Sequence, residues 1–257
     1  IVVAAMLGVL LQMDSLTVAG VTVPLPGLSI PQLFLALGIA NALVAIFIFS
    51  LVPEFFLRFL AWIYVSLFYR LRIHGVEDNV PDEGPALLVC NHVSYMDPLV
   101  ISGAVPRPIR FVMYYRIFNT PGLRWVFKAY RAIPIASAKE DPAVLEAAFE
   151  AIDQALAEGE LVCIFPEGGL TRDGEIAPFK PGVEKILARR PVPVVPMALT
   201  GLWASMWSKR DSRLGRLRAP RRLRAAISLI AAPPVPGEST SAAGLEQQVR
   251  ALRGNRP

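Results

Sequence analysis

From residue 70 onward, short apolar runs of strand length alternate with segments in which apolar residues recur at helical spacing. The strand candidates are residues 70–76, 86–90, 109–113, 132–136, 161–165, 193–199 and 225–231. The helix candidates are residues 142–158, 181–189 and 242–253. Asp141 and Pro142 suit the start of the first of these helices, and Gly159 suits its end. The alternation predicts an α/β fold in which helices flank a mixed sheet.

The first 69 residues are apolar in a different way, because no charge occurs between Asp14 and Glu54. Residues 31–52 form an uncharged run long enough, at about 1.5 Å per residue, to cross a hydrocarbon core of about 30 Å as a helix. A buried core helix is the alternative, although core helices seldom run this long without a charge. Residues 1–13 are too short to span, and we interpret them as the remnant of a helix cut by a processing boundary. Residues 53–69 add aromatic residues and sparse charge, which predicts an interfacial helix.

The distribution of charge supports a division of the chain at residue 70 into an apolar and a charged part. The 257 residues are 54% hydrophobic and only 18% charged, which excludes a disordered chain. Residues 70–257 carry 25 of the 26 basic and 19 of the 21 acidic residues, a net charge of +6. We therefore expect a membrane segment over 1–69, with membrane-embedded helices, and a globular domain over 70–257. Arg70 and Arg72 follow the apolar part directly, which predicts that this domain faces the cytoplasm.

The chain has two histidines, and one of them stands in a setting that suits catalysis. His74 lies in a strand-like run, which favours a structural or surface role. His92 follows the strand candidate 86–90 and precedes Asp97 by five residues. A histidine held by a carboxylate can act as a general base near neutral pH, provided that a turn brings the two together. The alternative is that Asp97 only caps a helix that begins at Pro98.

A second string, Phe165-Pro166-Glu167-Gly168-Gly169-Leu170-Thr171-Arg172, follows the strand candidate 161–165. Two glycines allow a ligand to approach the backbone closely, and their N–H groups can face phosphate oxygens. Arg172 and Lys180 could add charge-assisted contacts to an anion. An ordinary turn at the end of a strand is the alternative. The two cysteines, Cys90 and Cys163, sit in apolar strand-like runs, which favours buried, unreactive thiols and rules out a disulfide-rich scaffold.

Together, NHVSYMD, FPEGGLT and the later run VPVVPMAL resemble the glycerophospholipid acyltransferase family in order and spacing. The resemblance covers residues 70–235 and implies acyl transfer from a thioester to a glycerol hydroxyl. It implies that His92 is the base and that Asp97 orients it. It places Glu167, Gly168 and Gly169 at the acceptor, with Arg172 or Lys180 as countercharge. It implies no metal and no cofactor other than the thioester co-substrate, carried by acyl carrier protein or coenzyme A.

Two departures narrow the resemblance. The family continues Phe-Pro-Glu-Gly with Thr-Arg-Ser, whereas this chain reaches its arginine only at position 172. A family motif that ends in a phosphate-binding arginine corresponds to residues 131–137, with Arg131 at a glycine position and Ser137 at the arginine position. Both changes make the chain most like the acyltransferase portion of 2-acylglycerophosphoethanolamine acyltransferases, which are fused to lysophospholipid transporters of the major facilitator type. The resemblance therefore predicts a bacterial-type inner-membrane enzyme with its catalytic domain on the cytoplasmic face.

Other functions remain open. Within the same chemistry, a 1-acylglycerol-3-phosphate acyltransferase is the alternative, and from another class, a non-catalytic lysolipid-binding module attached to a transporter. A run of eight basic residues between Lys209 and Arg224 follows two tryptophans, which suits anionic lipid or an acidic carrier protein, although a solvated basic loop is also possible. The apolar N-terminal segment argues against nucleic acid as a partner.

Overall fold

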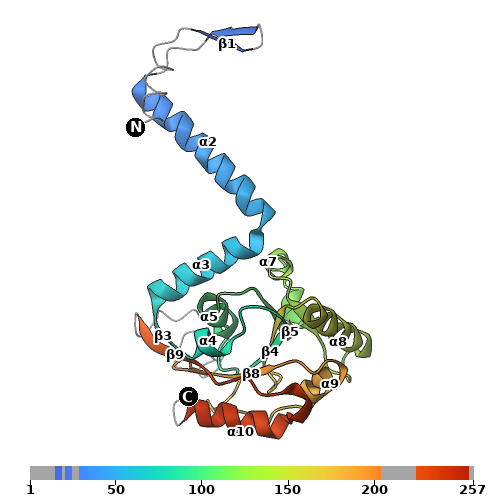
Figure 1. Ribbon diagram of the computed structural model, residues 1–257. Helices are drawn as coiled ribbons and strands as arrows, with labels where there is room; N and C mark the ends of the chain where they lie inside the picture. Colours follow the sequence, from blue (N-terminus) through green and yellow to red (C-terminus); the bar gives the residue numbers. More distant parts are fainter. Residues whose placement is uncertain (1–14, 19–20, 25–28, 204–223, 255–257) are drawn as a thin grey trace. The chain divides into compact units, whose positions relative to one another are not determined.

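The computed structural model describes residues 15–18, 21–24, 29–203 and 224–254, and the chain divides into two compact units, Ile1–Val52 and Pro53–Pro257 (Figure 1). The first unit contains β1 (Ser15–Val18) and β2 (Val21–Pro24), which form an antiparallel pair that was not predicted from the sequence, and helix α2 (Ile30–Leu51). The predicted helix remnant over residues 1–13 and most of the basic run from Lys209 lie outside the described residues.

Helix α2 covers the uncharged run of the sequence. Gln32 stabilises its start, because the side-chain oxygen accepts a hydrogen bond from the backbone N–H of Ser29 at 2.9 Å. Taken singly, none of the helices in the described part of the chain combines the length and apolarity needed to cross a membrane. Phe34–Phe49 and Pro53–Phe68 reach that length and composition only as a broken pair. The single spanning helix predicted over residues 31–52 is therefore not found among the described residues.

The second unit is built on a seven-stranded sheet in the order β3-β9-β8-β4-β7-β5-β6. Its strands are β3 (Tyr69–His74), β4 (Ala86–Cys90), β5 (Ile109–Tyr114), β6 (Ile133–Ile135), β7 (Leu161–Ile164), β8 (Val194–Thr200) and β9 (Ala225–Ala231). All pairings are parallel except that between β8 and β9, so β3 and β9 run opposite to the other five. The predicted mixed sheet is confirmed, and each strand candidate agrees to within two residues.

Helices cover both faces of this sheet. They are α3 (Pro53–Phe68), α4 (Val76–Asn79), α5 (Asp97–Ala104), α6 (Tyr115–Phe118), α7 (Arg124–Ala129), α8 (Pro142–Ala157), α9 (Gly182–Arg189) and α10 (Ala242–Arg253). Apolar side chains of α3, α4 and α5 form one hydrophobic core with the sheet, and those of α8, α9 and α10 form the other. The three predicted helices are confirmed to within a residue, and Asp141 caps α8 by accepting from two backbone N–H groups at 3.1 Å.

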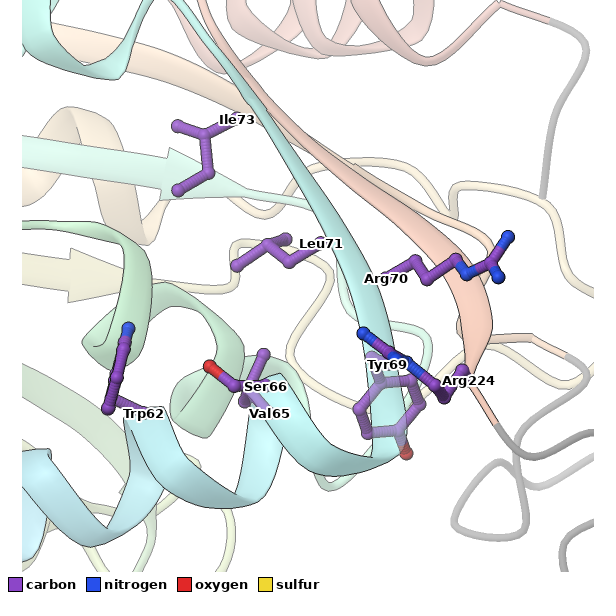
Figure 2. A pocket seen from close by; sticks show the side chains of 9 residues that line it. Trp62, Val65, Ser66, Tyr69, Arg70, Leu71, Ile73 and Arg224 are labelled. Atoms are coloured by element: carbon purple, nitrogen blue, oxygen red, sulfur yellow. The ribbon is translucent and has the colours of Figure 1, made fainter.

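Helix α3 belongs to the second unit and packs on α5. Gly103 of α5 makes this packing close, since a Cβ atom there would lie 3.5 Å from the Cα atom of Trp62. Beside this contact is a pocket of about 490 Å³, lined by Trp62, Val65, Ser66, Tyr69, Arg70, Leu71, Ile73, Gly103 and Arg224. Figure 2 shows Leu71 and Ile73 of β3 pointing to one side of the strand and Arg70 to the other. Leu71 and Ile73 therefore lie on the same side of β3 and give the pocket apolar surface, as Trp62 and Val65 of α3 do.

The arrangement of the strands collects chemistry-bearing segments at one edge of the sheet. Strands β4, β5, β6, β7 and β8 are mutually parallel, so their carboxyl ends meet there. Leu88 of β4 and Phe111 of β5 both pair with Cys163 of β7, which fixes the register across three neighbouring strands. Ligand sites in α/β sheets are commonly built from the segments that follow such strand ends. His92 and Glu167 both lie in these segments.

Candidate functional site

His92 and Asp97 lie in contact where β4 ends and α5 begins. The Nδ1 atom of His92 lies 2.8 Å from Oδ2 of Asp97. A carboxylate oxygen accepts hydrogen bonds, so this geometry places the ring proton on Nδ1 and leaves the lone pair on Nε2. The His92 side chain is 18% exposed, whereas that of Asp97 is fully buried. The pair thus has the arrangement of a histidine base with an orienting carboxylate.

A tight turn brings the two side chains together. Oδ2 of Asp97 also accepts the backbone N–H groups of Val93 at 2.8 Å and Ser94 at 3.0 Å. Its second oxygen, Oδ1, is buried and has no hydrogen-bond partner among the described residues. Met96 occupies the N-cap position of α5 and Asp97 is its first residue, so Asp97 organises the preceding turn and is not the cap itself. The turn that the five-residue spacing requires is present.

Asn91 attaches this turn to strand β8 of the sheet. Its side-chain amide donates to the carbonyl of Leu199 at 3.0 Å, and its side-chain oxygen accepts the N–H of the same residue at 2.8 Å. Backbone pairing of β4 with β8 ends at Cys90, and the fully buried Asn91 side chain continues the hydrogen bonding to β8 beyond that point. Asn91 therefore supports the backbone at His92 and takes no direct part in chemistry.

Phe165 provides a wall for the histidine ring. It follows β7 directly, and its ring stacks on that of His92 with 4.2 Å between the centroids and 18° between the planes. Stacking of this kind restricts rotation of the imidazole and shields one of its faces. No sequence pattern predicted this role, although Phe165 is the first residue of the second string and follows a strand that neighbours β4.

Glu167 supports the backbone around His92. One of its oxygens accepts the N–H of His92 at 2.7 Å, and the other accepts the N–H of Ala177 at 2.8 Å. The carbonyl of His92 in turn accepts the N–H of Thr171 at 3.0 Å. Burial raises the pKa of the Glu167 carboxyl, opposed by these backbone hydrogen bonds. Both carboxylate oxygens of this predicted acceptor-site residue are thus engaged by the protein backbone.

The glycines after Glu167 lie at the surface beside a lysine. Gly168 has a φ of 70°, and its N–H donates to the carbonyl of Phe165 at 2.9 Å, so this N–H group is already used. A Cβ atom at Gly168 would lie 2.1 Å from Nζ of Lys180, which shows how closely the lysine covers it. Gly169 faces open space. The structure thus brings Gly168 and Lys180 together, while Arg172 is exposed further along the same loop.

The two thiols are poor candidates for nucleophiles. Cys90 and Cys163 are fully buried, as predicted, and burial raises the pKa of each thiol well above its ordinary value. A nucleophile that attacks as a thiolate needs the opposite shift. The chemistry that this edge of the sheet can perform is therefore proton removal by His92 from a group that reaches its Nε2 atom.

The part of the chain that contains this site is similar to known proteins. The model of a protein family described as Acyltransferase matches residues 70–200, which contain both motifs. The chain is 30% identical over 169 residues to a probable 1-acyl-sn-glycerol-3-phosphate acyltransferase of Mycoplasma pneumoniae, which covers 61% of each chain. It is 30% identical over 142 residues to a chloroplastic 1-acyl-sn-glycerol-3-phosphate acyltransferase of Brassica napus, which covers 54% of this chain and 40% of the relative.

A solved structure shares the fold. The crystal structure of the 1-acyl-sn-glycerophosphate acyltransferase PlsC from Thermotoga maritima matches with a TM-score of 0.58 at 23% sequence identity, over 72% of this chain and 71% of that one. The chain spans 40% to 61% of the length of the two relatives named above. Because the family model matches just over half of the sequence, this chain belongs to the acyltransferase family.

Proposed function

We propose that the protein transfers a fatty acyl group from a thioester to the free hydroxyl of a lysophospholipid. The observation that carries this proposal is the contact between His92 and the buried Asp97, which leaves Nε2 of His92 as a base at the carboxyl edge of the sheet. The names of the relatives support acylation of a glycerophospholipid. The acyl donor would be acyl carrier protein or acyl-coenzyme A.

In this mechanism, Nε2 of His92 takes the proton of the acceptor hydroxyl as its oxygen attacks the thioester carbon. The C–O bond forms, and the carbonyl electrons move to oxygen to give a tetrahedral intermediate. Collapse of this intermediate breaks the C–S bond, and the imidazolium returns its proton to the departing thiolate. Asp97 holds the ring and stabilises the imidazolium. The step needs no covalent enzyme intermediate, which agrees with the buried, high-pKa thiols.

The predicted binding residues take supporting roles in this proposal. Lys180 lies over Gly168, so its ammonium group and the backbone N–H of the exposed Gly169 would face the acceptor's phosphate. Arg172 would add positive charge from the same loop. Glu167 would act mainly by holding the backbone of His92, since both its oxygens accept backbone hydrogen bonds.

The acceptor has two candidates. The departures at Ser137 and Arg172 favour a phosphodiester acceptor, as in a 2-acylglycerophosphoethanolamine acyltransferase joined to a lysophospholipid transporter. The names of the relatives favour lysophosphatidic acid, the acceptor of a 1-acylglycerol-3-phosphate acyltransferase. A direct competition between lysophosphatidylethanolamine and lysophosphatidic acid decides between them.

The enzyme would work at a membrane, on the cytoplasmic face of a bacterial-type inner membrane. Residues 1–69 would be the membrane segment and residues 70–257 the acyltransferase domain. Helix α3 supports this, because large apolar side chains along it are exposed, and Arg70 and Arg72 follow it. The exposed residues are Phe55, Phe59, Leu60, Trp62, Leu67 and Phe68. Such a surface suits the interface between acyl chains and head groups.

The test replaces each member of the pair. With the full chain in detergent, His92→Ala and Asp97→Asn should each lower kcat by roughly 10²–10⁴-fold, as expected for loss of general-base catalysis. Lysolipid binding, measured by fluorescence, should be retained. His74→Ala is the matched control, because His74 is exposed on β3 and should keep full activity. Wild-type turnover in His92→Ala would refute the mechanism and support a lysolipid-binding module instead.

A further inference from the structure

A second group of polar side chains lies where β5 and β6 end, at the same edge of the sheet as His92. The hydroxyl of Tyr114 donates to one oxygen of Glu140 at 2.6 Å, and the hydroxyl of Ser137 donates to the other at 3.0 Å. The guanidinium of Arg116 lies 4.0 Å from the first of these oxygens and 5.6 Å above the ring of Tyr115. We name these five residues the edge cluster.

The edge cluster presents fixed charges of both signs to solvent. The hydrogen bond from Tyr114, followed by that from Ser137, lowers the pKa of the Glu140 carboxyl, so the group stays ionised at neutral pH. The side chain of Arg116 is 67% exposed, and that of Glu140 is 36% exposed. The rings of Tyr114 and Tyr115 stand nearly perpendicular, with 80° between their planes. The cluster therefore offers a cation, an anion and aromatic faces within one small area.

Sheet register places this cluster within reach of His92. Leu88 of β4 and Phe111 of β5 both pair with Cys163 of β7, so they occupy the same position along the sheet. Three residues further along the two chains, Tyr114 therefore lies at the same position as Asn91, the residue before His92. Only β7 separates β4 from β5, and neighbouring strands lie about 4.8 Å apart, so the two segments are about 10 Å apart across the sheet. Tyr114 also pairs with Ile135, which brings Ser137 and Glu140 to the same edge.

We propose that the edge cluster binds the head group of a zwitterionic acceptor that carries a phosphodiester and a primary ammonium group. This inference rests on the proposed acyl transfer. Arg116 would add a second positive charge beside the phosphodiester that Lys180 faces, and the ammonium group would donate to Glu140 against the ring of Tyr114. Each carboxylate oxygen has two lone-pair sites, so Glu140 keeps acceptor capacity beside its bonds to Tyr114 and Ser137.

The dimensions of such an acceptor fit this placement. Roughly eight or nine covalent bonds, depending on which glycerol hydroxyl is free, separate the reacting hydroxyl of a lysophosphatidylethanolamine from its nitrogen, and at about 1.25 Å of extended length per bond they span about 10–11 Å. A hydroxyl at Nε2 of His92 can thus belong to a molecule whose ammonium group reaches the cluster. A terminal phosphate, in contrast, would bring a second negative charge toward Glu140, which is unfavourable. Ser137 stands at the position of the arginine in the family motif, and in this structure it donates a hydrogen bond to the Glu140 carboxylate.

The test compares acceptors in single-substitution variants of the full chain in detergent. Glu140→Gln should raise KM for lysophosphatidylethanolamine about tenfold and leave kcat nearly unchanged, because it removes a charged hydrogen-bond partner from binding alone. Glu140→Lys should shift the preference further toward lysophosphatidic acid. Arg116→Gln should raise KM for both acceptors alike. Glu150→Gln, at an exposed position of α8, is the control and should change neither constant.

A second measurement separates this proposal from the proposed function. Glycerophosphoethanolamine, which lacks an acyl chain, should bind more tightly to the wild type than to the Glu140→Gln variant. Calorimetry measures both affinities. A wild type that transfers no acyl group to any lysolipid would overturn the proposed function and this proposal together. If the wild type is active and both Glu140→Gln and Glu140→Lys keep its acceptor preference, only the role of the edge cluster would be overturned.

Discussion

Replacement of Glu167 by glutamine tests whether this motif residue acts through the protein backbone. Glu167 is 6% exposed, and its carboxylate accepts the N–H groups of His92 and Ala177 with one oxygen each. Glutamine has nearly the same shape but only one acceptor oxygen. Its amide nitrogen must therefore face one of the two N–H donors, which leaves that donor without a partner.

The expected cost follows from these two contacts. A hydrogen bond to a charged group contributes about 1.5–3 kcal/mol, and a buried donor left unsatisfied costs a similar amount. The neutral amide recovers part of this cost, because burial disfavours the ionised carboxyl. We therefore expect Glu167→Gln to lower the free energy of unfolding by about 2 kcal/mol near neutral pH. Because the lost bond can be the one to His92, kcat should fall as well.

The stability difference between wild type and Glu167→Gln should also depend on pH, in a direction that the pKa of Glu167 predicts. The pKa of Glu167 is raised above its ordinary value of 4.5, so the folded protein takes up a proton at a higher pH than the unfolded chain does. The contribution of Glu167 to folding thus becomes more favourable as pH falls through the folded pKa toward 4.5, and glutamine lacks this gain. The stability difference between wild type and Glu167→Gln should be larger at pH 5 than at pH 8.

Urea unfolding followed by tryptophan fluorescence, at both pH values and in the same detergent, measures this difference. Glu150→Gln supplies the matched control, because Glu150 is exposed and the same chemical change there should have almost no effect. A Glu167→Gln variant with wild-type stability and a strongly raised KM would refute the positioning role and restore Glu167 as an acceptor-binding residue.

Two further predictions concern backbone conformation. Arg131 has a φ of 51°, so Arg131→Gly should be more stable than Arg131→Ala by about 1 kcal/mol in urea unfolding, although both variants lose the same ion pair with Glu160. Equal stabilities would argue against the left-handed conformation. Gly168→Ala should cost about 1 kcal/mol, because φ is 70° and the new Cβ atom displaces Lys180, whereas Gly169→Ala should be nearly neutral in thermal melts.

The sheet could be predicted because its strands are short apolar runs separated by polar turns. In β4, β7 and β8 every residue is buried, so the sequence reads as continuous hydrophobic stretches. The start of helix α8 could be predicted to the residue, because Asp141 and Pro142 fix it. The hairpin of β1 and β2 was missed although Ser15–Val18 and Val21–Pro24 both alternate polar and apolar residues, because four residues are too few for the alternation to stand out inside an uncharged segment.

The candidate site could be predicted only in part. The contact between His92 and Asp97 could be expected because the two residues are five apart and a turn can join them. The contacts of Glu167 depend on the path of the loop as far as Ala177, and local sequence does not determine that path. The contact of Tyr114 with Glu140 joins residues 26 positions apart, at the ends of strands whose order in the sheet no short motif reveals.

The placement of these groups on different strands has a consequence for how the site can vary. The base and its carboxylate belong to the turn between β4 and α5, and Glu167 to the segment after β7. The edge cluster belongs to the segments after β5 and β6, with Glu140 held by Tyr114 and Ser137 alone among the hydrogen bonds described. Exchange of Glu140 therefore breaks no contact of His92 or of its support. If the edge cluster binds the head group as proposed, acceptor choice can change while the base and its supporting hydrogen bonds stay intact, since the two functions share an edge of the sheet and no side chain.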